Sequence, residues 1–295
     1  MALGWWAGPT VSDLIIHLRL PFQLLLAPIF LWGLLLGGGR IHLGVIAAFA
    51  LFHVCLYGGA TAFNSAYDRD TGPVGGLERP PPVSAGLLPF SIGVLLIGWV
   101  ACAALSLTLA AVYGAILFLA VAYSHPRLRW KAGPVSSLLT IFVGQGLFGF
   151  LGGWVAAGAG VGQLVGSGGL LGALAASLVV AGFYPLTQLF QIEEDRARGD
   201  RTVAVAWGID SSFRLAQAAL LAGGAAVAAT VLGRSGLGEA LLALGFFIAL
   251  VGAVEAWRRS FDPAAVLVNF RRAMRLNTAA AVALIGYVSW HLART

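Results

Sequence analysis

Long apolar blocks separated by short polar connections run through the whole sequence. An α-helix rises about 1.5 Å per residue, so a block of roughly 20 residues can cross a hydrocarbon core about 30 Å thick. Because a backbone in lipid must satisfy its own hydrogen bonds, each block is expected to be helical. The sequence predicts about nine spanning helices, at residues 18–36, 42–66, 88–106, 108–124, 136–157, 169–190, 211–233, 237–256 and 273–292.

The composition indicates an integral membrane protein without a soluble domain. Only 10% of the residues are charged and 59% are hydrophobic, whereas roughly a quarter are charged in soluble domains. The segment before the first block contains Asp13 and His17 and lacks the basic start and small-residue cleavage site of a secretory signal, so the first block is kept as a span. Residues 1–295 are therefore predicted to form a single all-α transmembrane domain.

The basic residues predict how the chain is oriented. Most of the 18 lysines and arginines fall at the N-terminal edge or in the even-numbered connections. These are Arg19, Arg69, Arg79, Arg127, Arg129, Lys131, Arg196, Arg198, Arg201, Arg214, Arg258, Arg259, Arg271, Arg272 and Arg275. The excess-cation rule then places the N-terminus and the even connections in the cytoplasm. A net charge of +6 spread over membrane edges does not indicate nucleic-acid binding.

Seven of the 12 acidic residues lie in two predicted cytoplasmic windows, which are Asp68, Asp70 and Glu78, and then Glu193, Glu194, Asp195 and Asp200. The pairs Asn64–Asp68 and Gln191–Asp195 repeat a spacing of one helical turn, which places each pair on one helix face. Carboxylate and amide oxygens are ligands that Mg²⁺ accepts, with water and phosphate completing its shell. The alternative is that the acids pair with neighbouring arginines, Arg198 among them.

Three further features concern polar groups close to these windows. Arg129 and Lys131 follow Arg127 in the fourth connection, where clustered cations suit a polyanion; Arg127 alone is interpreted as a charge anchor. Gln145 and Gln188 are uncharged polar residues inside predicted spans. Such groups face the bundle interior, either beside a substrate or in an interhelical hydrogen bond. Asn277 and His291 are interpreted as structural.

With these residues in place, the sequence resembles the UbiA superfamily of intramembrane prenyltransferases over nearly its full length. The first family motif corresponds to Asn64, Ser65, Asp68 and Asp70, and the second to QIEEDRARGDRT, residues 191–202. Tyr123, Arg129 and Lys131 match the family's fourth connection, and Arg19 matches an arginine near the first helix. The chain departs from the pattern at Ser65, Gly72 and Gln191, each of which stands where a carboxylate is expected.

The resemblance implies that two Mg²⁺ ions bridge the windows to the diphosphate of an allylic isoprenoid, through Asn64, Asp68, Asp70, Gln191, Glu194 and Asp195. It implies diphosphate contacts from Arg19, Arg129, Lys131 and Arg201, and it assigns catalysis to Asp68, Asp195 and Lys131. Gln145 and Gln188 are candidates for contact with the acceptor or the isoprenoid tail. The expected reaction transfers a prenyl group to a small acceptor, expected to be aromatic, through an allylic cation, with release of diphosphate.

Two other functions stay open at this point. Some UbiA relatives are terpene cyclases, in which a double bond of the isoprenoid itself captures the cation. A transporter would place ionisable groups near the middle of the membrane, whereas the acids here cluster at one membrane face. Product analysis without an acceptor separates a cyclase from a transferase.

Overall fold

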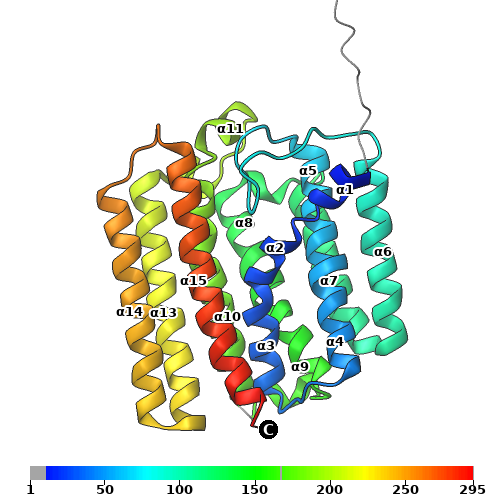
Figure 1. Ribbon diagram of the computed structural model, residues 1–295, viewed down its shortest axis with the longest axis vertical. Helices are drawn as coiled ribbons and strands as arrows, with labels where there is room; N and C mark the ends of the chain where they lie inside the picture. The colour runs from blue at the N-terminus through cyan, green and yellow to red at the C-terminus, as the bar shows by residue number, and fades with distance from the viewer. Residues whose placement is uncertain (1–10, 167, 295) are drawn as a thin grey trace, which may run out of the picture.

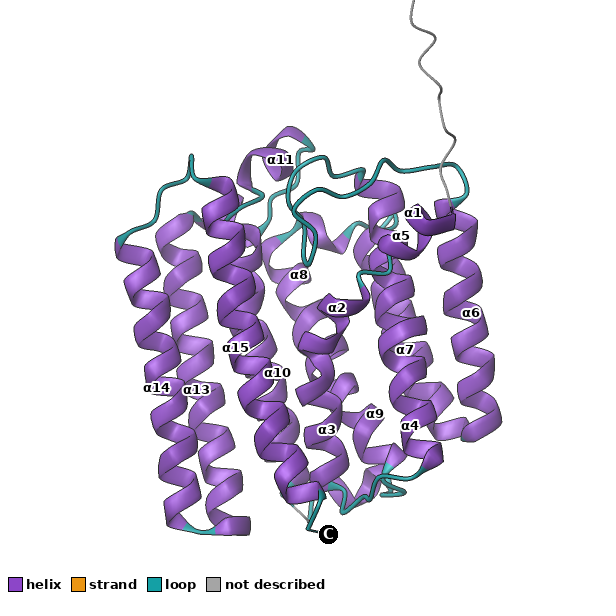
Figure 2. Ribbon diagram, in the orientation of Figure 1, coloured by secondary structure: helices purple, strands orange, loops and turns teal. Residues whose placement is uncertain are grey.

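The computed structural model describes residues 11–166 and 168–294, so the first ten residues, whose cytoplasmic placement the charge pattern predicts, lie outside it. The described chain is a bundle of roughly parallel helices (Figures 1 and 2). The elements are α1 (Val11–Ile16), α2 (Leu20–Gln23), η1 (Leu24–Leu26), α3 (Ala27–Leu36), α4 (Leu43–Ala50), η2 (Leu51–Gly58), α5 (Gly59–Asp68), α6 (Leu87–Leu105), α7 (Leu107–Ser124), η3 (Trp130–Ala132), α8 (Pro134–Ile141), η4 (Phe142–Phe148), α9 (Gly149–Ala156), η5 (Val161–Leu164), α10 (Gly169–Gln188), α11 (Ile192–Ala197), α12 (Val203–Trp207), α13 (Ile209–Ser235), α14 (Leu237–Arg259) and α15 (Val266–Leu292).

The predicted all-α membrane architecture is confirmed. Within the described residues, 8 helical stretches are long and apolar enough to cross a membrane, and each overlaps one of the first eight predicted spans. They are Val11–Leu36, Leu43–Asp68, Leu87–Leu105, Leu107–Ser124, Pro134–Ala156, Gly169–Gln188, Ile209–Ser235 and Leu237–Arg259. The ninth predicted span coincides with α15, which is 27 residues long but does not belong to this group. Nine is therefore an approximate count.

Two of the spans contain π-helical turns, which hydropathy does not predict. In the second span α4 continues through η2 into α5, and in the fifth span α8 continues through η4 into α9. A π turn widens the helix locally and turns the side chains beyond it, and such turns recur at functional sites. Here they place Tyr57 of η2 and Gln145 of η4 on the wall of the same cavity.

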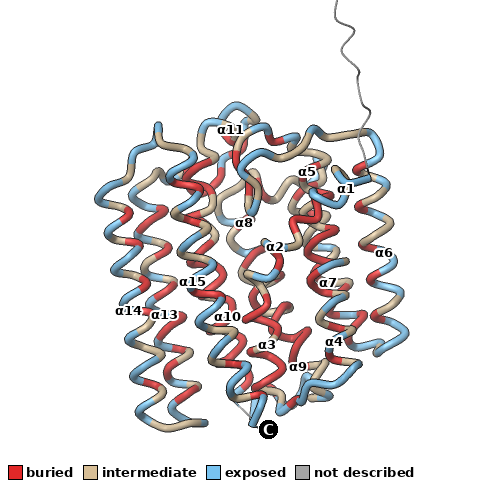
Figure 3. Tube along the Cα trace, in the orientation of Figure 1, coloured by how far each residue is buried: buried red, intermediate tan, exposed pale blue. Residues whose placement is uncertain are grey.

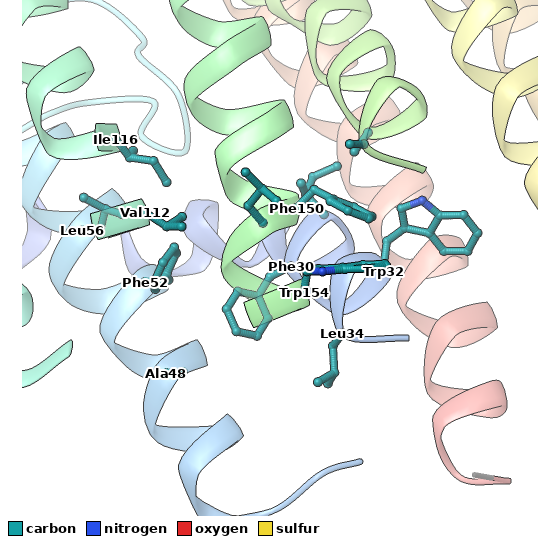
Figure 4. Packing of buried hydrophobic residues seen from close by; sticks show 14 of the residues in the cluster. Phe30, Trp32, Leu34, Ala48, Phe52, Leu56, Val112, Ile116, Phe150 and Trp154 are labelled. Carbon is teal, nitrogen blue, oxygen red and sulfur yellow. The ribbon is translucent and has the colours of Figure 1, made fainter. Parts of the chain in front are cut away.

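Glycine allows α3 and α9 to approach closely. A Cβ atom at Gly33 would overlap the carbonyl of Phe150, and one at Gly153 would overlap the carbonyl of Phe30. Around this crossing the rings of Phe150 and Trp154 are stacked, with centroids 5.9 Å apart, and Phe30 lies beside them (Figure 4). This contact between small residues is typical of membrane helices, where close backbone packing replaces the hydrophobic effect.

Burial separates the central helices from those that face lipid (Figure 3). The buried share of the apolar stretch is 78% in α10, but only 28% in α6 and 22% in α14. α10 packs along α13 on one side and against η4 on the other. The outer helices expose large apolar side chains, among them Leu107 and Leu242, as expected where the solvent is hydrocarbon.

One end of the bundle carries the polar connections that form the site. The 69–86 connection and α11 lie together at the top of Figure 1, at the end opposite the C-terminus. Glu194 of α11 accepts hydrogen bonds from the backbone of Thr71 and Gly72, and Arg201 donates its backbone N–H to the carbonyl of Ala132. These bonds join three connections into a single polar layer.

Candidate active site

A cavity of about 260 Å³ opens below this polar layer. Its wall is mostly apolar and also carries polar side chains, among which Arg19, Asn64 and Gln191 belong to or adjoin the polar connections. The polar lining residues include Arg19, Gln23, Tyr57, Thr61, Asn64, Tyr123, Ser124, Thr140, Gln145, Tyr184, Thr187, Gln191 and Asn277. Apolar lining residues come from several helices and include Leu26, Ile29, Ile116, Leu119, Ile141, Val180, Phe183 and Leu284. The cavity therefore suits a ligand with a polar head and an apolar tail.

The first acidic window begins on the last turns of α5. This helix extends through Asp68, so the predicted common face of Asn64 and Asp68 is present. The Asp68 side chain is only 5% exposed and forms an ion pair with Lys131. The Oδ1 atom of Asn64 accepts hydrogen bonds from Lys131, at 3.3 Å, and from Ser124, at 2.9 Å. The ammonium group of Lys131 is thus held by both members of the pair.

Arg19 approaches the same window from the first span. Its backbone has a φ of 51°, a left-handed conformation at the N-cap of α2, which begins at Leu20 and has Pro21 in its first turn. The side chain is buried and donates from Nη2 to the Ser65 hydroxyl at 2.6 Å. Ser65 stands at the position where the family pattern has a carboxylate. The buried Nε of Arg19 has no hydrogen-bond partner among the described groups, and Arg19 lines the cavity. An anion at this end would satisfy that donor.

The second window differs from the sequence prediction in one respect. The sixth helix does not continue through it but ends at Gln188, and α11 begins at Ile192 after Gln191 as the N-cap residue. Gln191 and Asp195 nevertheless stay one turn apart, because the Asp195 N–H donates to the Gln191 carbonyl at 2.8 Å. Gln191 lines the cavity, while Asp195 is buried and accepts from the Thr202 hydroxyl at 3.1 Å.

Burial dominates the electrostatics of the aspartates outside the spans. It raises the pKa of Asp195 to about 6, since an ionised carboxylate loses its hydration there, although Arg198 and Thr202 act in the opposite direction. The pKa of Asp70 is also raised, first by burial and then by the neighbouring charge of Asp68. Carboxyl groups whose pKa is raised by burial next to a charged side chain are typical of functional sites.

Arg198 joins the two windows, which the sequence analysis did not anticipate. It donates from Nη1 to Asp70 at 2.5 Å and from Nη2 to Asp195 at 2.6 Å, and its Nε lies 3.4 Å from Asp200. Burial alone would lower the pKa of Arg198, but the carboxylates around it raise the value. Only the alternative in which acids pair with neighbouring arginines pointed to this residue, and for Asp70 and Asp195 that pairing is present.

Arg129 is fixed on the same layer by a bidentate ion pair. Its Nε and Nη2 atoms donate to the two oxygens of Asp200, at 2.8 and 2.9 Å, and its Nη2 lies 3.9 Å from Asp68. Its backbone φ is 43°, a conformation that costs a non-glycine residue about 1–3 kcal/mol. The surrounding ion pairs hold the residue there.

The remaining acids of the windows have structural partners. Glu194 accepts from the Thr71 hydroxyl and backbone N–H and from the Gly72 N–H, at 2.7–3.1 Å. It therefore reaches the point where the first motif lacks its third carboxylate. Glu78 lies apart from the other acids and pairs with Arg271 of α15 at 2.6 Å, in an exposed position.

The other predicted residues divide between the cavity and its surroundings. Gln145 lines the cavity. Gln188 is buried and accepts a long hydrogen bond of 3.4 Å from the Ala204 backbone, and within the described part of the chain it is not on the cavity wall. Arg201 is exposed, and its guanidinium makes no ion pair with another described residue. The roles assigned to Gln188 and Arg201 stay predictions.

Two further polar features of the cavity were not predicted, namely the contact of Tyr123 with Tyr184 and the position of Asn277. The hydroxyls of Tyr123 and Tyr184 lie 2.9 Å apart, on α7 and α10, between the two windows. Asn277 of α15 lines the cavity, although its isolated position suggested a structural role. Pro185, directly after Tyr184 inside α10, was a signal in the sequence, because a proline inside a helix removes a backbone hydrogen bond and kinks the helix.

The donor set fits magnesium in kind. Asn64, Asp68, Asp70 and Asp195 offer oxygen atoms, and Mg²⁺ binds few protein carboxylates because phosphate and water supply the rest. Among the described residues no group of three or more acids, histidines or cysteines is arranged to hold a metal by itself. Arginine and lysine side chains lie between the acids instead. The site therefore suits a metal that arrives together with an anionic ligand.

The fold was compared with solved structures. A UbiA homolog from Archaeoglobus fulgidus bound to DMAPP and Mg²⁺ shares 19% identity, with a TM-score of 0.66 over 93% of this chain and 99% of that chain. The same homolog bound to GPP and Mg²⁺ shares 18%, with a TM-score of 0.66 over 93% and 100%. The apo UbiA homolog from Aeropyrum pernix K1 shares 23%, with a TM-score of 0.67 over 93% and 97%.

At these identities the structures establish a common fold. Comparison with curated proteins finds no match. The family model of the UbiA prenyltransferases matches residues 26–288, which include every site residue described above except Arg19 and Gln23 of the first span. That match, the shared fold and the two polar windows above an apolar cavity have one explanation: the chain is an enzyme of the UbiA prenyltransferase family.

Proposed function

We propose that this protein transfers a prenyl group, in a Mg²⁺-dependent reaction, from an isoprenoid diphosphate to a small aromatic acceptor inside the membrane. The observation that carries the proposal is the cavity, whose wall combines many apolar side chains with Asn64, Gln191 and Arg19. A diphosphate head bound among these groups leaves the tail among apolar side chains. The solved relatives with DMAPP or GPP and Mg²⁺ support the same class of donor.

The residues divide the chemistry between binding and ionisation. Arg19, Arg129 and Lys131 would neutralise diphosphate oxygens, and Asn64 and Asp68 would hold the metal. A bound Mg²⁺ would stabilise the charge that builds on the diphosphate. The allylic carbon–oxygen bond breaks with its electron pair on the leaving oxygen, and the fixed cations stabilise that charge without reorganising. The acceptor then forms the new bond to the allylic carbon and loses a proton.

The cavity also protects the cation. Water would quench an allylic cation, so a site enclosed by helices and closed by the 69–86 connection favours transfer over hydrolysis. Gly75 and Gly76 of this connection lie against the ring of Phe22, and Val74 and Gly75 line the cavity. Aromatic faces such as Tyr123 and Tyr184 stabilise positive charge by about 0.5–2 kcal/mol each.

The charge pattern supports a cytoplasmic site. The basic connections lie at the same end of the bundle as the windows (Figure 1), and the excess-cation rule places that end in the cytoplasm. A water-soluble diphosphate head would then enter from the cytoplasm while the tail enters from lipid. Labelling of single cysteines introduced in the 69–86 connection, in intact cells and in inverted vesicles, tests this orientation.

The test of function uses the purified chain in lipid with Mg²⁺ and farnesyl or geranylgeranyl diphosphate. Diphosphate release and products are followed with and without a panel of aromatic acids. We expect little release until an acceptor is added. A cyclic hydrocarbon formed without acceptor would replace the transferase by a terpene cyclase, and the absence of release under both conditions would refute both enzymes.

A further inference from the structure

Arg198 occupies the space between the two acidic windows as a fixed positive charge. It contacts Asp70, which follows α5, and Asp195, on α11, through different nitrogens at 2.5 and 2.6 Å. Its side chain is 20% exposed, whereas those of Asp70 and Asp195 are 3% and 8% exposed. The guanidinium has five N–H donors, and three of its nitrogens already contact carboxylates. The contact is therefore a buried bridge with N–H groups to spare.

The oxygens of the second window are engaged by protein donors. One oxygen of Asp195 accepts a hydrogen bond from Arg198 and the other accepts from Thr202. Both oxygens of Asp200 accept from Arg129. Gln191, which lies one turn before Asp195, has no charge to offer a metal. A divalent cation at this window would have to displace Arg198 from Asp195 or sit beside it, against the repulsion of a neighbouring positive charge.

The first window is better suited to a metal. Asn64 and Asp68 project from one helix face, and Asn64 lies on the cavity wall. Their cation is the ammonium of Lys131, which ends a flexible four-carbon chain and can move to a phosphate oxygen when a ligand enters. Asn64, Asp68 and phosphate oxygens together supply the kind of ligand set that Mg²⁺ uses in nucleotide enzymes.

We propose that this site takes one divalent cation, at Asn64 and Asp68, and that Arg198 supplies at the second window the positive charge that a second ion would bring. The inference rests on the proposed function and departs from the two ions that the family resemblance implies. It also explains why the chain tolerates glutamine at 191, since a guanidinium held by Asp195 and Asp70 needs no further carboxylate. Arg198 is then a positioning residue, which fixes Asp70 and Asp195 and keeps a positive charge at the second window.

The test counts metal ions directly. Mn²⁺ replaces Mg²⁺ at oxygen sites, and its binding to the full-length protein in lipid is followed by electron paramagnetic resonance at saturating inorganic diphosphate. We expect one Mn²⁺ per chain in the wild type. In the variant Gln191→Asp combined with Arg198→Gln, the second window regains a carboxylate pair and loses its cation, so we expect two. Arg196→Gln is the matched control, because Arg196 is exposed and pairs only with Glu193 in the described chain.

Two ions in the wild type would overturn the inference, and so would a single ion in both the wild type and the folded double variant. The wild-type count needs no mutation, so misfolding of the variant leaves the test decisive. The result is also separate from the proposed function. Acceptor-dependent diphosphate release with two bound ions would refute the inference alone, whereas one bound ion without any prenyl transfer or diphosphate release would refute the proposed function.

Discussion

Replacing Asp68 by asparagine tests the centre of the site, because it affects a metal ligand and a buried ion pair at once. The substitution removes one negative charge and keeps the shape. Asp68 and Lys131 are 5% and 7% exposed, so solvent compensates little for the lost partner. Breaking a buried pair from one side costs about 3–5 kcal/mol. We expect the loss of stability to lie toward the lower end of this range, because Lys131 still donates to the Asn64 oxygen at 3.3 Å.

The loss of activity should exceed what stability explains. Removing one preorganised electrostatic contact with a transition state costs about 10²–10³-fold in rate, or about 2.7–4 kcal/mol. Asp68→Asn should therefore lower acceptor-dependent diphosphate release by at least this factor. The variant should also unfold at a lower temperature, because an ammonium is left in a buried site without its carboxylate.

A second substitution separates the two effects. Lys131→Met in the Asp68→Asn background removes the unpaired charge and keeps an unbranched side chain of similar length. The double variant should recover thermal stability, measured by intrinsic fluorescence in detergent, while staying inactive. Wild-type turnover in Asp68→Asn would refute the proposed metal site. A double variant no more stable than Asp68→Asn would refute the view that the Lys131 charge is what destabilises the single variant.

Three further predictions concern packing, pH and backbone conformation. Gly153→Ala should lower the unfolding temperature, because its Cβ would overlap the Phe30 carbonyl and overpacking costs about 1–3 kcal/mol, whereas the control Gly93→Ala meets nothing within 4 Å and should not. Burial raises the pKa of Asp195 to about 6, so between the ordinary pKa of an aspartate and pH 6 the folded state binds more protons than the unfolded state. The wild type should therefore lose stability relative to Asp195→Asn as the pH rises through this range. A stability difference that stays constant with pH would contradict this. Arg69 has a φ of 52° after α5, so Arg69→Gly should leave stability unchanged or raise it by up to about 1 kcal/mol, and a clear loss would show that the arginine side chain contributes.

Hydropathy predicted the spans well because a membrane imposes a length on each helix. It could not predict the details that depend on neighbouring helices. α11 separates from α10 at Gln188, although the apolar pattern runs on to Phe190, and Phe190 is buried against Phe270 of α15. The π turns of η2 and η4 likewise leave no period in the sequence that a hydropathy window would detect.

The sequence also indicated which connections form the site, since charge and spacing mark both windows. It did not indicate partners. Arg198 is one of several arginines in a basic stretch, and its contact with Asp70 joins residues 128 positions apart. Such a contact depends on how α5 and α11 are brought together by the bundle, which spacing along one helix cannot express. The position of Asn277 on the cavity wall was not predicted for the same reason, because it depends on which face of α15 is turned to the cavity.

Two of the departures from the family pattern, at Ser65 and Gly72, are occupied by protein hydrogen bonds. Where a carboxylate is missing at Ser65, its hydroxyl accepts from Arg19, and at Gly72 the backbone N–H donates to Glu194. The four aspartates that stay are matched by protein cations, in the contacts Asp68–Lys131, Asp70–Arg198, Asp195–Arg198 and Asp200–Arg129. Buried carboxylates without partners would repel one another and favour an open polar layer until a metal arrived. With its charges already paired, this layer keeps its arrangement without metal, so chelation should abolish diphosphate release while leaving the unfolding temperature nearly unchanged.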